Sequence, residues 1–143
     1  MKVPHKFVIL TTVLNQLIGF LWYSPMLFLG AWAAAQGKSL SEMTMSDPLP
    51  FVWDIAHAIA LSYATAWVIA RSEASCPVTG AKVGALLALA FTVPALGAHY
   101  GFLGLPGTVL LVDAGKELVA GALIGAIFGF AKMRMLSPSR AVA

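Results

Sequence analysis

The chain has little charge and almost no cysteine. Only 10% of its 143 residues are Asp, Glu, Lys or Arg, against about 25% in a typical soluble domain. The single cysteine, Cys76, excludes an intrachain disulfide, and there is no CxxC pair of the kind that holds zinc or a redox centre. A phosphate-binding loop, a dinucleotide fingerprint and a recognisable catalytic triad are also missing. These absences argue against a soluble enzyme, and we predict neither a catalytic activity nor a cofactor.

Apolar sequence, in contrast, is abundant. Hydrophobic residues make up 59% of the chain, and the mean hydropathy is +0.85. Four apolar runs are each close to the roughly 20 residues that cross a bilayer, where a span must be helical to satisfy its own backbone. We therefore predict an all-α membrane protein, a four-helix transmembrane bundle that forms a single domain over residues 1–143. The predicted helices cover residues 7–23, 51–70, 83–103 and 108–131.

The first apolar run has an alternative interpretation as a secretory signal peptide, with a small-residue cleavage site at 33–35. Asn15 and Gln16 interrupt its apolar core, and the cleavage site lies about a dozen residues beyond its end. An uncleaved first helix fits these features better.

Lysine and arginine are distributed unequally between the two ends of the predicted helices. Seven of them lie before the first helix, between the second and third, or after the fourth, whereas the loop over residues 24–50 contains only Lys38. Because basic flanks stay on the cytoplasmic side, we predict a multi-pass protein of the bacterial inner membrane with both termini in the cytoplasm and an external loop over 24–50. Orientation in the lipid bilayer accounts for the basic residues, and we predict no nucleic-acid partner.

Six ionisable residues interrupt the predicted spans. Each such group costs about 2.5–3.5 kcal/mol at the centre of a helix on insertion scales, so these residues usually face protein or water and mark functional sites. The predicted topology brings all six to the outer half of the membrane. We therefore expect a buried polar cluster that opens outward, made of Asp54, His57, His99, Asp113, Lys116 and Glu117.

Sequence spacing suggests roles within this cluster. Asp113 and Lys116 are three positions apart on one helix, which predicts an ion pair that locks packing or sets subunit register. Glu117 has no obvious partner in the sequence and is the candidate proton- or cation-binding acid. The two histidines and the acids match a metal site only in residue type, so whether a metal binds stays open.

Small residues recur every four positions on the predicted helices. The stripe on the last helix runs through Asp113, Glu117, Gly121, Gly125 and Gly129, and the third helix carries Gly97 and Gly101. Such stripes let helix backbones approach closely. We predict helix packing at these glycines, either within the chain or in a homodimer.

The first helix ends in the sequence GFLWYSPMLFLGAW, residues 19–32. Trp22 and Tyr23 suit an anchor at the outer membrane interface, Ser24 can satisfy freed backbone groups, and Pro25 ends or kinks the helix. The segment that follows is too short to span, so we expect it to lie in the interface or to re-enter it. There it would serve as a simple anchor or as a lid over the outward cluster.

This motif, together with Gly-Ala-Ile at 125–127, resembles the signature of a family of small bacterial four-helix membrane proteins, the domain-of-unknown-function family seventeen-sixty-one. The resemblance covers nearly the whole chain, and it implies a fold and a location but no reaction. Where the family's pattern leads us to expect an Asn-Ala-Gly-like sequence in the last helix, this chain reads Asp-Ala-Gly at 113–115.

Three classes of function remain. The first is a non-catalytic accessory subunit or structural membrane protein, whose buried charges specify assembly as a homo-oligomer or within a larger membrane complex. The alternative is a small-solute or ion transporter coupled to protonation of Glu117 or Asp113. The second alternative is a membrane-embedded metal protein or enzyme that uses His57, His99 and the acids.

Overall fold

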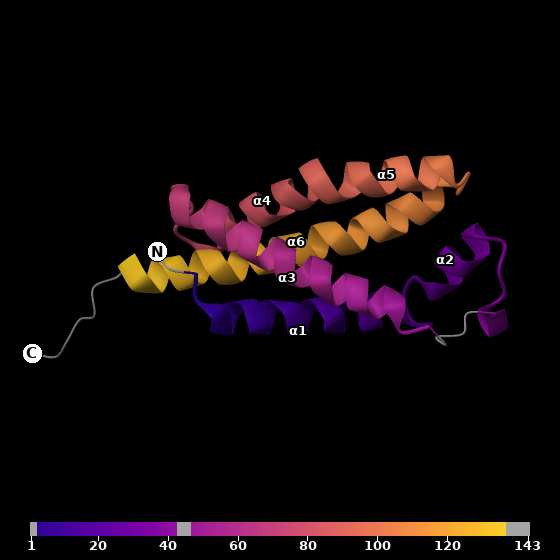
Figure 1. The fold of residues 1–143 in the computed structure, drawn as a ribbon, viewed down its shortest axis with the longest axis horizontal. Coiled ribbons are helices and arrows are strands. Elements are labelled where there is room, and N and C mark those ends of the chain that lie inside the picture. The colour runs from indigo at the N-terminus through magenta and orange to yellow at the C-terminus, as the bar shows by residue number, and fades with distance from the viewer. Residues whose placement is uncertain (1–2, 43–46, 137–143) are drawn as a thin grey trace, which may run out of the picture.

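The computed structural model describes residues 3–42 and 47–136, and every regular element in those ranges is helical. The elements α4, η2 (a π-helical turn) and α5 follow one another without a break and form one rod. This rod and the helices α1, α3 and α6 are four long segments that run side by side (Figure 1). The short α2 follows α1 at one end of the bundle. In chain order the elements are α1 (His5–Trp22), α2 (Leu29–Ala35), η1 (Leu40–Glu42), α3 (Leu49–Arg71), α4 (Pro77–Leu87), η2 (Ala88–Thr92), α5 (Val93–Phe102) and α6 (Gly107–Leu136).

Three helical segments within the described ranges are long and apolar enough to cross a membrane, namely α3, the α4–α5 rod and α6. These observations support the predicted all-α membrane protein. The fourth segment, α1, has 18 residues, including Asn15 and Gln16 in its middle, and it packs along α3 and α6. The beginning of α1 and the end of α6 lie at the same end of the bundle (Figure 1).

The third predicted helix begins earlier than expected, at Pro77 rather than at residue 83. Proline is favoured in the first turn of a helix, and Cys76 caps that turn through a reciprocal pair of hydrogen bonds with Thr79. Hydrogen bonding from Thr79 also holds the pKa of the Cys76 thiol below its ordinary value. The helix was predicted to begin where the apolar run begins. Its first residues were missed because a helix can begin with polar capping residues before its apolar face.

Helices α4 and α6 pack backbone against backbone along their glycines. A Cβ on Gly80 would lie against the Gly125 carbonyl oxygen and 2.9 Å from Gly129 Cα, and one on Gly84 would lie against the Gly121 carbonyl oxygen. The glycine stripe of α6 is thus used within the chain. Its partners on α4 were not predicted, and Gly80 lies outside the helix predicted over residues 83–103.

The other glycine pair assigned to this packing, Gly97 and Gly101, does not take part in it. A Cβ on Gly97 would meet only the flexible end of Leu110, at 3.4 Å, and one on Gly101 would meet nothing within 4 Å. Both residues follow the π turn, beyond which the rod no longer approaches α6 at backbone distance. The prediction of a packing stripe there is wrong.

The π turn η2 precedes Pro94, the second residue of α5. Proline has no N–H and its ring clashes with the carbonyl four residues earlier, so an α-helix cannot pass through it unchanged. A π turn places one extra residue in the helix, which rotates everything after it by about 100° relative to an unbroken helix. The face that α5 turns toward α6 is therefore offset by one position.

An apolar core occupies the half of the bundle where α1 begins and α6 ends. It is built from buried residues of α1, α3, α6 and the α3–α4 link: Val8, Leu61, Ala66, Ile69, Ala74, Ile124 and Phe128. At the edge of this core, the Lys132 ammonium donates to the carbonyl oxygens of Ile69 and Ser72, which are unsatisfied at the end of α3. The polar residues gather in the other half.

Candidate functional site

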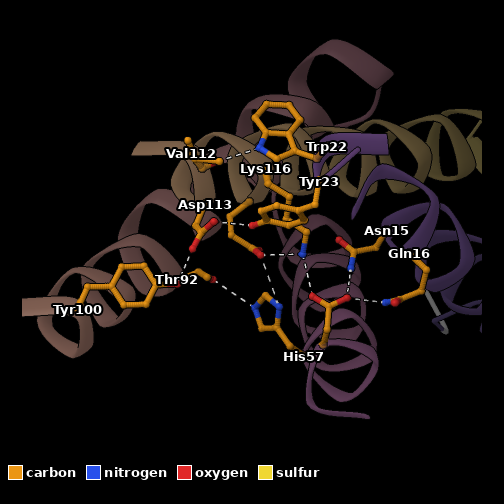
Figure 2. Close-up of polar contacts among 12 residues, drawn as sticks. Asn15, Gln16, Trp22, Tyr23, His57, Thr92, Tyr100, Val112, Asp113 and Lys116 are labelled. Atoms are coloured by element: carbon orange, nitrogen blue, oxygen red, sulfur yellow. Dashed lines mark hydrogen bonds and ion pairs between the residues drawn. The ribbon is translucent and has the colours of Figure 1, made fainter. Parts of the chain in front are cut away.

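Side chains from four helical segments converge in the half of the bundle near α2 (Figure 2). We call this group the polar cluster. Each of its members is linked to another by a hydrogen bond or an ion pair, and its carboxylates, its lysine and its histidine come from α3 and α6. The cluster consists of Asn15, Gln16, Tyr23, Asp54, His57, Thr92, Tyr100, Asp113, Lys116 and Glu117.

Lys116 is the cation at the centre of the cluster. Its Nζ lies 2.8 Å from Asp54 Oδ1 and 2.9 Å from Glu117 Oε1, and only 4% of the residue is exposed. Asp54 also accepts a hydrogen bond from Gln16 Nε2 at 2.7 Å. Lys116 therefore joins α6 to α3, and Gln16 extends this link to α1.

The predicted ion pair between Asp113 and Lys116 is not formed. Asp113 instead accepts hydrogen bonds at 2.5 Å from two phenols, Tyr23 on Oδ1 and Tyr100 on Oδ2. Residues three apart on a helix can pair, but each long side chain takes the strongest partner that tertiary packing offers. For Lys116 that partner is Asp54 of α3, so the carboxylate of Asp113 is left to neutral donors.

The Trp-Tyr motif at the end of α1 also binds to α6. Trp22 Nε1 donates to the Val112 carbonyl oxygen at 3.0 Å, and the Trp22 ring lies so close to Gly115 that a Cβ there would be 2.9 Å from it. The position of Trp22 and Tyr23 at the membrane interface stays a prediction, and the structure adds that both side chains are hydrogen-bonded to α6. The indole N–H and the phenol thus both have fixed acceptors on α6.

The rest of the motif forms the turn between α1 and α2. Pro25 is exposed and follows the end of α1, as predicted. The Ser24 hydroxyl oxygen, however, is buried without a hydrogen-bond partner, and it is the Ser24 carbonyl that accepts from Leu27 N at 3.0 Å. The helix α2 then packs against α6, with Trp32 edge-on to Tyr23 at 5.4 Å between ring centroids.

Glu117 uses only one of its two carboxylate oxygens. Oε1 accepts from Lys116, so the expectation that Glu117 lacks a partner is wrong for this atom. Oε2 is buried and has no hydrogen-bond partner; the nearest ionisable atom is His57 Nδ1 at 3.8 Å, beyond hydrogen-bond distance. The other ring nitrogen, Nε2, lies 3.4 Å from Thr92 Oγ1. Glu117 thus has a free acceptor directed at a histidine.

His99 was predicted to belong to the polar cluster but lies outside it. Its side chain is exposed, and the next residue, Tyr100, reaches Asp113 in its place. The physical reason is the extra residue in η2, which turns position 100 and not position 99 toward α6. The other five ionisable residues predicted for the cluster, Asp54, His57, Asp113, Lys116 and Glu117, do come together.

Three of these residues could offer ligand atoms to a metal ion. One atom each from Asp54, His57 and Glu117 lies within 4.8 Å of the others. Lys116, however, already places its ammonium between the two carboxylates. A metal ion would have to compete with that cation, so the donor set fits a divalent ion poorly.

Five members of the cluster were not predicted to belong to it, namely Asn15, Gln16, Tyr23, Thr92 and Tyr100. Asn15 and Gln16 were noted only as interruptions of the first apolar run, Tyr23 was predicted as an interface anchor, and no role was predicted for Thr92 or Tyr100. The signal that could have found Gln16, Thr92 and Tyr100 is their spacing: Gln16 lies next to the buried Asn15, and Thr92 and Tyr100 flank the proline that displaces the helix face. Neutral donors near buried acids are as informative as opposite charges.

Comparison with known proteins agrees with the resemblance seen in the sequence. The family model described as "Protein of unknown function (DUF1761)" matches residues 7–129, most of the 143-residue chain. The comparison with curated proteins found no match, and neither did the comparison with solved structures.

Proposed function

This chain belongs to the DUF1761 family of proteins of unknown function, and we propose that it is an integral membrane protein that binds and releases a proton at Glu117 and uses this step to handle a small ion or solute. The observation that carries the proposal is the buried Oε2 of Glu117, which has no hydrogen-bond partner and faces His57 Nδ1 at 3.8 Å.

A proton on Glu117 Oε2 or on His57 Nδ1 would supply the hydrogen bond that is missing between these two groups. The groups that face Glu117 are Lys116 from α6 and His57 from α3, with Asp54 reached through Lys116. Asp113 and its two phenols complete the cluster. Three carboxylates against one ammonium leave a negative excess when His57 is neutral. Such an excess is costly where solvation is poor, so uptake of a cation is favourable.

His57 connects the buried acid to the surface of the bundle. Its side chain is 34% exposed, whereas that of Glu117 is 9% exposed. Imidazole exchanges protons near neutral pH and is the usual shuttle between a buried group and its surroundings. The pair therefore has the arrangement of an acceptor and its relay.

We place the chain in the bacterial inner membrane, with α1 as a fourth span and both termini in the cytoplasm. Two features support this placement. The start of α1 and the end of α6 share one end of the bundle (Figure 1), and basic residues gather at that end, as they do on cytoplasmic flanks. In this orientation the polar cluster lies in the outer half of the bilayer.

Infrared spectroscopy of the purified protein tests the protonation step. As the pH is lowered, wild-type protein should show the band of a protonated carboxyl group in a poorly hydrated site, and Glu117→Gln should remove that band. The matched control is Glu73→Gln, because Glu73 is exposed in the link between α3 and α4. A band that persists in Glu117→Gln would exclude Glu117 as the proton acceptor.

The coupling to transport is tested in proteoliposomes that contain a pH-sensitive dye. Under an imposed membrane potential, wild-type protein should admit protons, and Glu117→Gln should abolish this flux while Glu73→Gln leaves it unchanged. Equal flux through wild type and Glu117→Gln would overturn the proposal.

A second candidate function, assembly with a further membrane protein, is favoured by the exposure of Asp54 and His57. Their side chains are 33% and 34% exposed, although they lie one to two turns inside α3. Ionisable groups at that depth are covered by protein or water rather than by lipid tails. A second copy of this chain would cover them and make the protein a homo-oligomer.

Native mass spectrometry of the detergent-solubilised protein checks this assembly. We expect wild-type dimers, monomers for His57→Leu, and dimers for the control His99→Leu, whose histidine is exposed outside the cluster. A monomeric wild type, or dimers that survive in His57→Leu, would contradict assembly through this surface.

A further inference from the structure

A groove of about 270 Å³ lies at the opposite end of the bundle from the polar cluster, between the start of α1 and the end of α6. Its walls are largely apolar, and its aromatic lining residues are Phe7 and Phe130. Two of its lining residues, Lys6 and Arg134, are basic, and none is acidic. The groove therefore combines an apolar wall with a pair of positive charges.

The two cations are held at the groove by their aromatic neighbours. Lys6 Nζ lies 5.3 Å from the centroid of the Phe7 ring, and Arg134 Cζ lies 5.1 Å from that of Phe130. Neither takes part in an ion pair among the described residues. Lys132, two positions from Arg134, is instead committed to the carbonyl oxygens at the end of α3. Lys6 and Arg134 thus keep donors available for an anion.

We propose that this groove binds an anionic phospholipid, with the phosphate between Lys6 and Arg134 and an acyl chain along Phe7 and Phe130. Charge complementarity selects the headgroup, because basic residues between helix ends on the cytoplasmic side attract anionic lipids. The apolar wall selects a lipid over a free phosphate, since phosphate alone would leave the aromatic surface unused. The site is independent of Glu117 and His57.

The position of the two residues suits a lipid headgroup. Lys6 is in the first turn of α1 and Arg134 in the last turn of α6, so both lie where the apolar part of each helix ends. Both side chains are exposed, and neither is part of the apolar core. Phe130 is 38% exposed, and Met135, also in the groove, is 54% exposed. Such a surface is open to an acyl chain from the bilayer.

Native mass spectrometry with added phosphatidylglycerol tests the site. Wild-type protein should retain one phosphatidylglycerol molecule in preference to phosphatidylcholine, and the double variant Lys6→Ala with Arg134→Ala should bind it about thirtyfold more weakly, from roughly fivefold per cation. The control of equal charge is Arg71→Ala with Lys82→Ala, which removes two exposed basic residues that do not line the groove. It should retain the lipid.

Three results would overturn the proposal. Equal loss of lipid in the control variant would show that total charge, not this groove, attracts it. Equal retention of phosphatidylcholine would show that the headgroup is not recognised. Displacement of the lipid by inorganic phosphate would show that the site recognises phosphate without the acyl chain. Thermal unfolding of the double variant at the wild-type temperature checks that the fold is intact.

Discussion

Replacing Lys116 with methionine is expected to destabilise the protein by about 3 kcal/mol, toward the lower end of the cost of breaking a buried ion pair. The substitution keeps the length and apolar body of the side chain but leaves Asp54 and Glu117 as neighbouring carboxylates without their cation. We expect a loss of free energy near the lower end of that range because the Asp54 side chain is 33% exposed, so water can partly solvate its unpaired charge. Unfolding in detergent, followed by circular dichroism, measures the change in free energy.

A charge-compensated variant separates this effect from a simple loss of packing. Lys116→Met combined with Asp54→Asn and Glu117→Gln removes the cation together with both of its anions, and it should recover most of the stability. Lys82→Met changes an exposed lysine and should unfold like the wild type. If Lys116→Met alone were as stable as wild type, the ion pairs of Lys116 would not contribute to the stability of the fold.

Adding a single methyl group at Gly125 is expected to have an effect of similar size. In Gly125→Ala the new Cβ would lie against the Gly80 carbonyl oxygen and within 2.9 Å of Gly84 N. These are backbone atoms, so no flexible side chain can move aside and the helices must separate. Overpacking costs about 1–3 kcal/mol and sometimes more. We expect a lower free energy of unfolding in the same detergent assay.

Gly101→Ala is the matched control, because its Cβ would meet no atom within 4 Å. Exchanging glycine for alanine inside a helix is favourable by up to about 1 kcal/mol when space allows, so this variant should be as stable as wild type or slightly more stable. A stable Gly125→Ala would mean that α4 and α6 do not meet at backbone distance.

The stabilities of the Lys116 and Gly125 variants test two different parts of α6. Along α6, the residues nearer its start meet α1, α3 and α5 through hydrogen bonds and ion pairs, while the later glycines meet α4 through their backbones. The polar half requires its partners at defined distances. The glycine half holds α6 against α4 and so sets where that polar half can lie.

Much of this arrangement was predictable because it depends on local sequence. The apolar runs predicted the long helices, and the spacing of four on α6 predicted that Asp113, Glu117 and the glycines share a buried face. A helix repeats every 3.6 residues, so the residues that share its buried face can be read from the order of the chain alone. The gathering of acids, lysine and one histidine in one half of the bundle followed from the same count.

The partner of each polar side chain was decided only by the tertiary structure. The face that α3 or α5 turns toward α6 depends on the rotation and register of the helices. Neither can be read from the sequence periodicity within one helix. The π turn before Pro94 shows this most directly, because a single extra residue brings Tyr100 to Asp113 and leaves His99 exposed. By itself the sequence determined the buried face of α6 and the half of the bundle in which the charges gather; packing then determined that Lys116 binds Asp54 and that one oxygen of Glu117 stays without a partner.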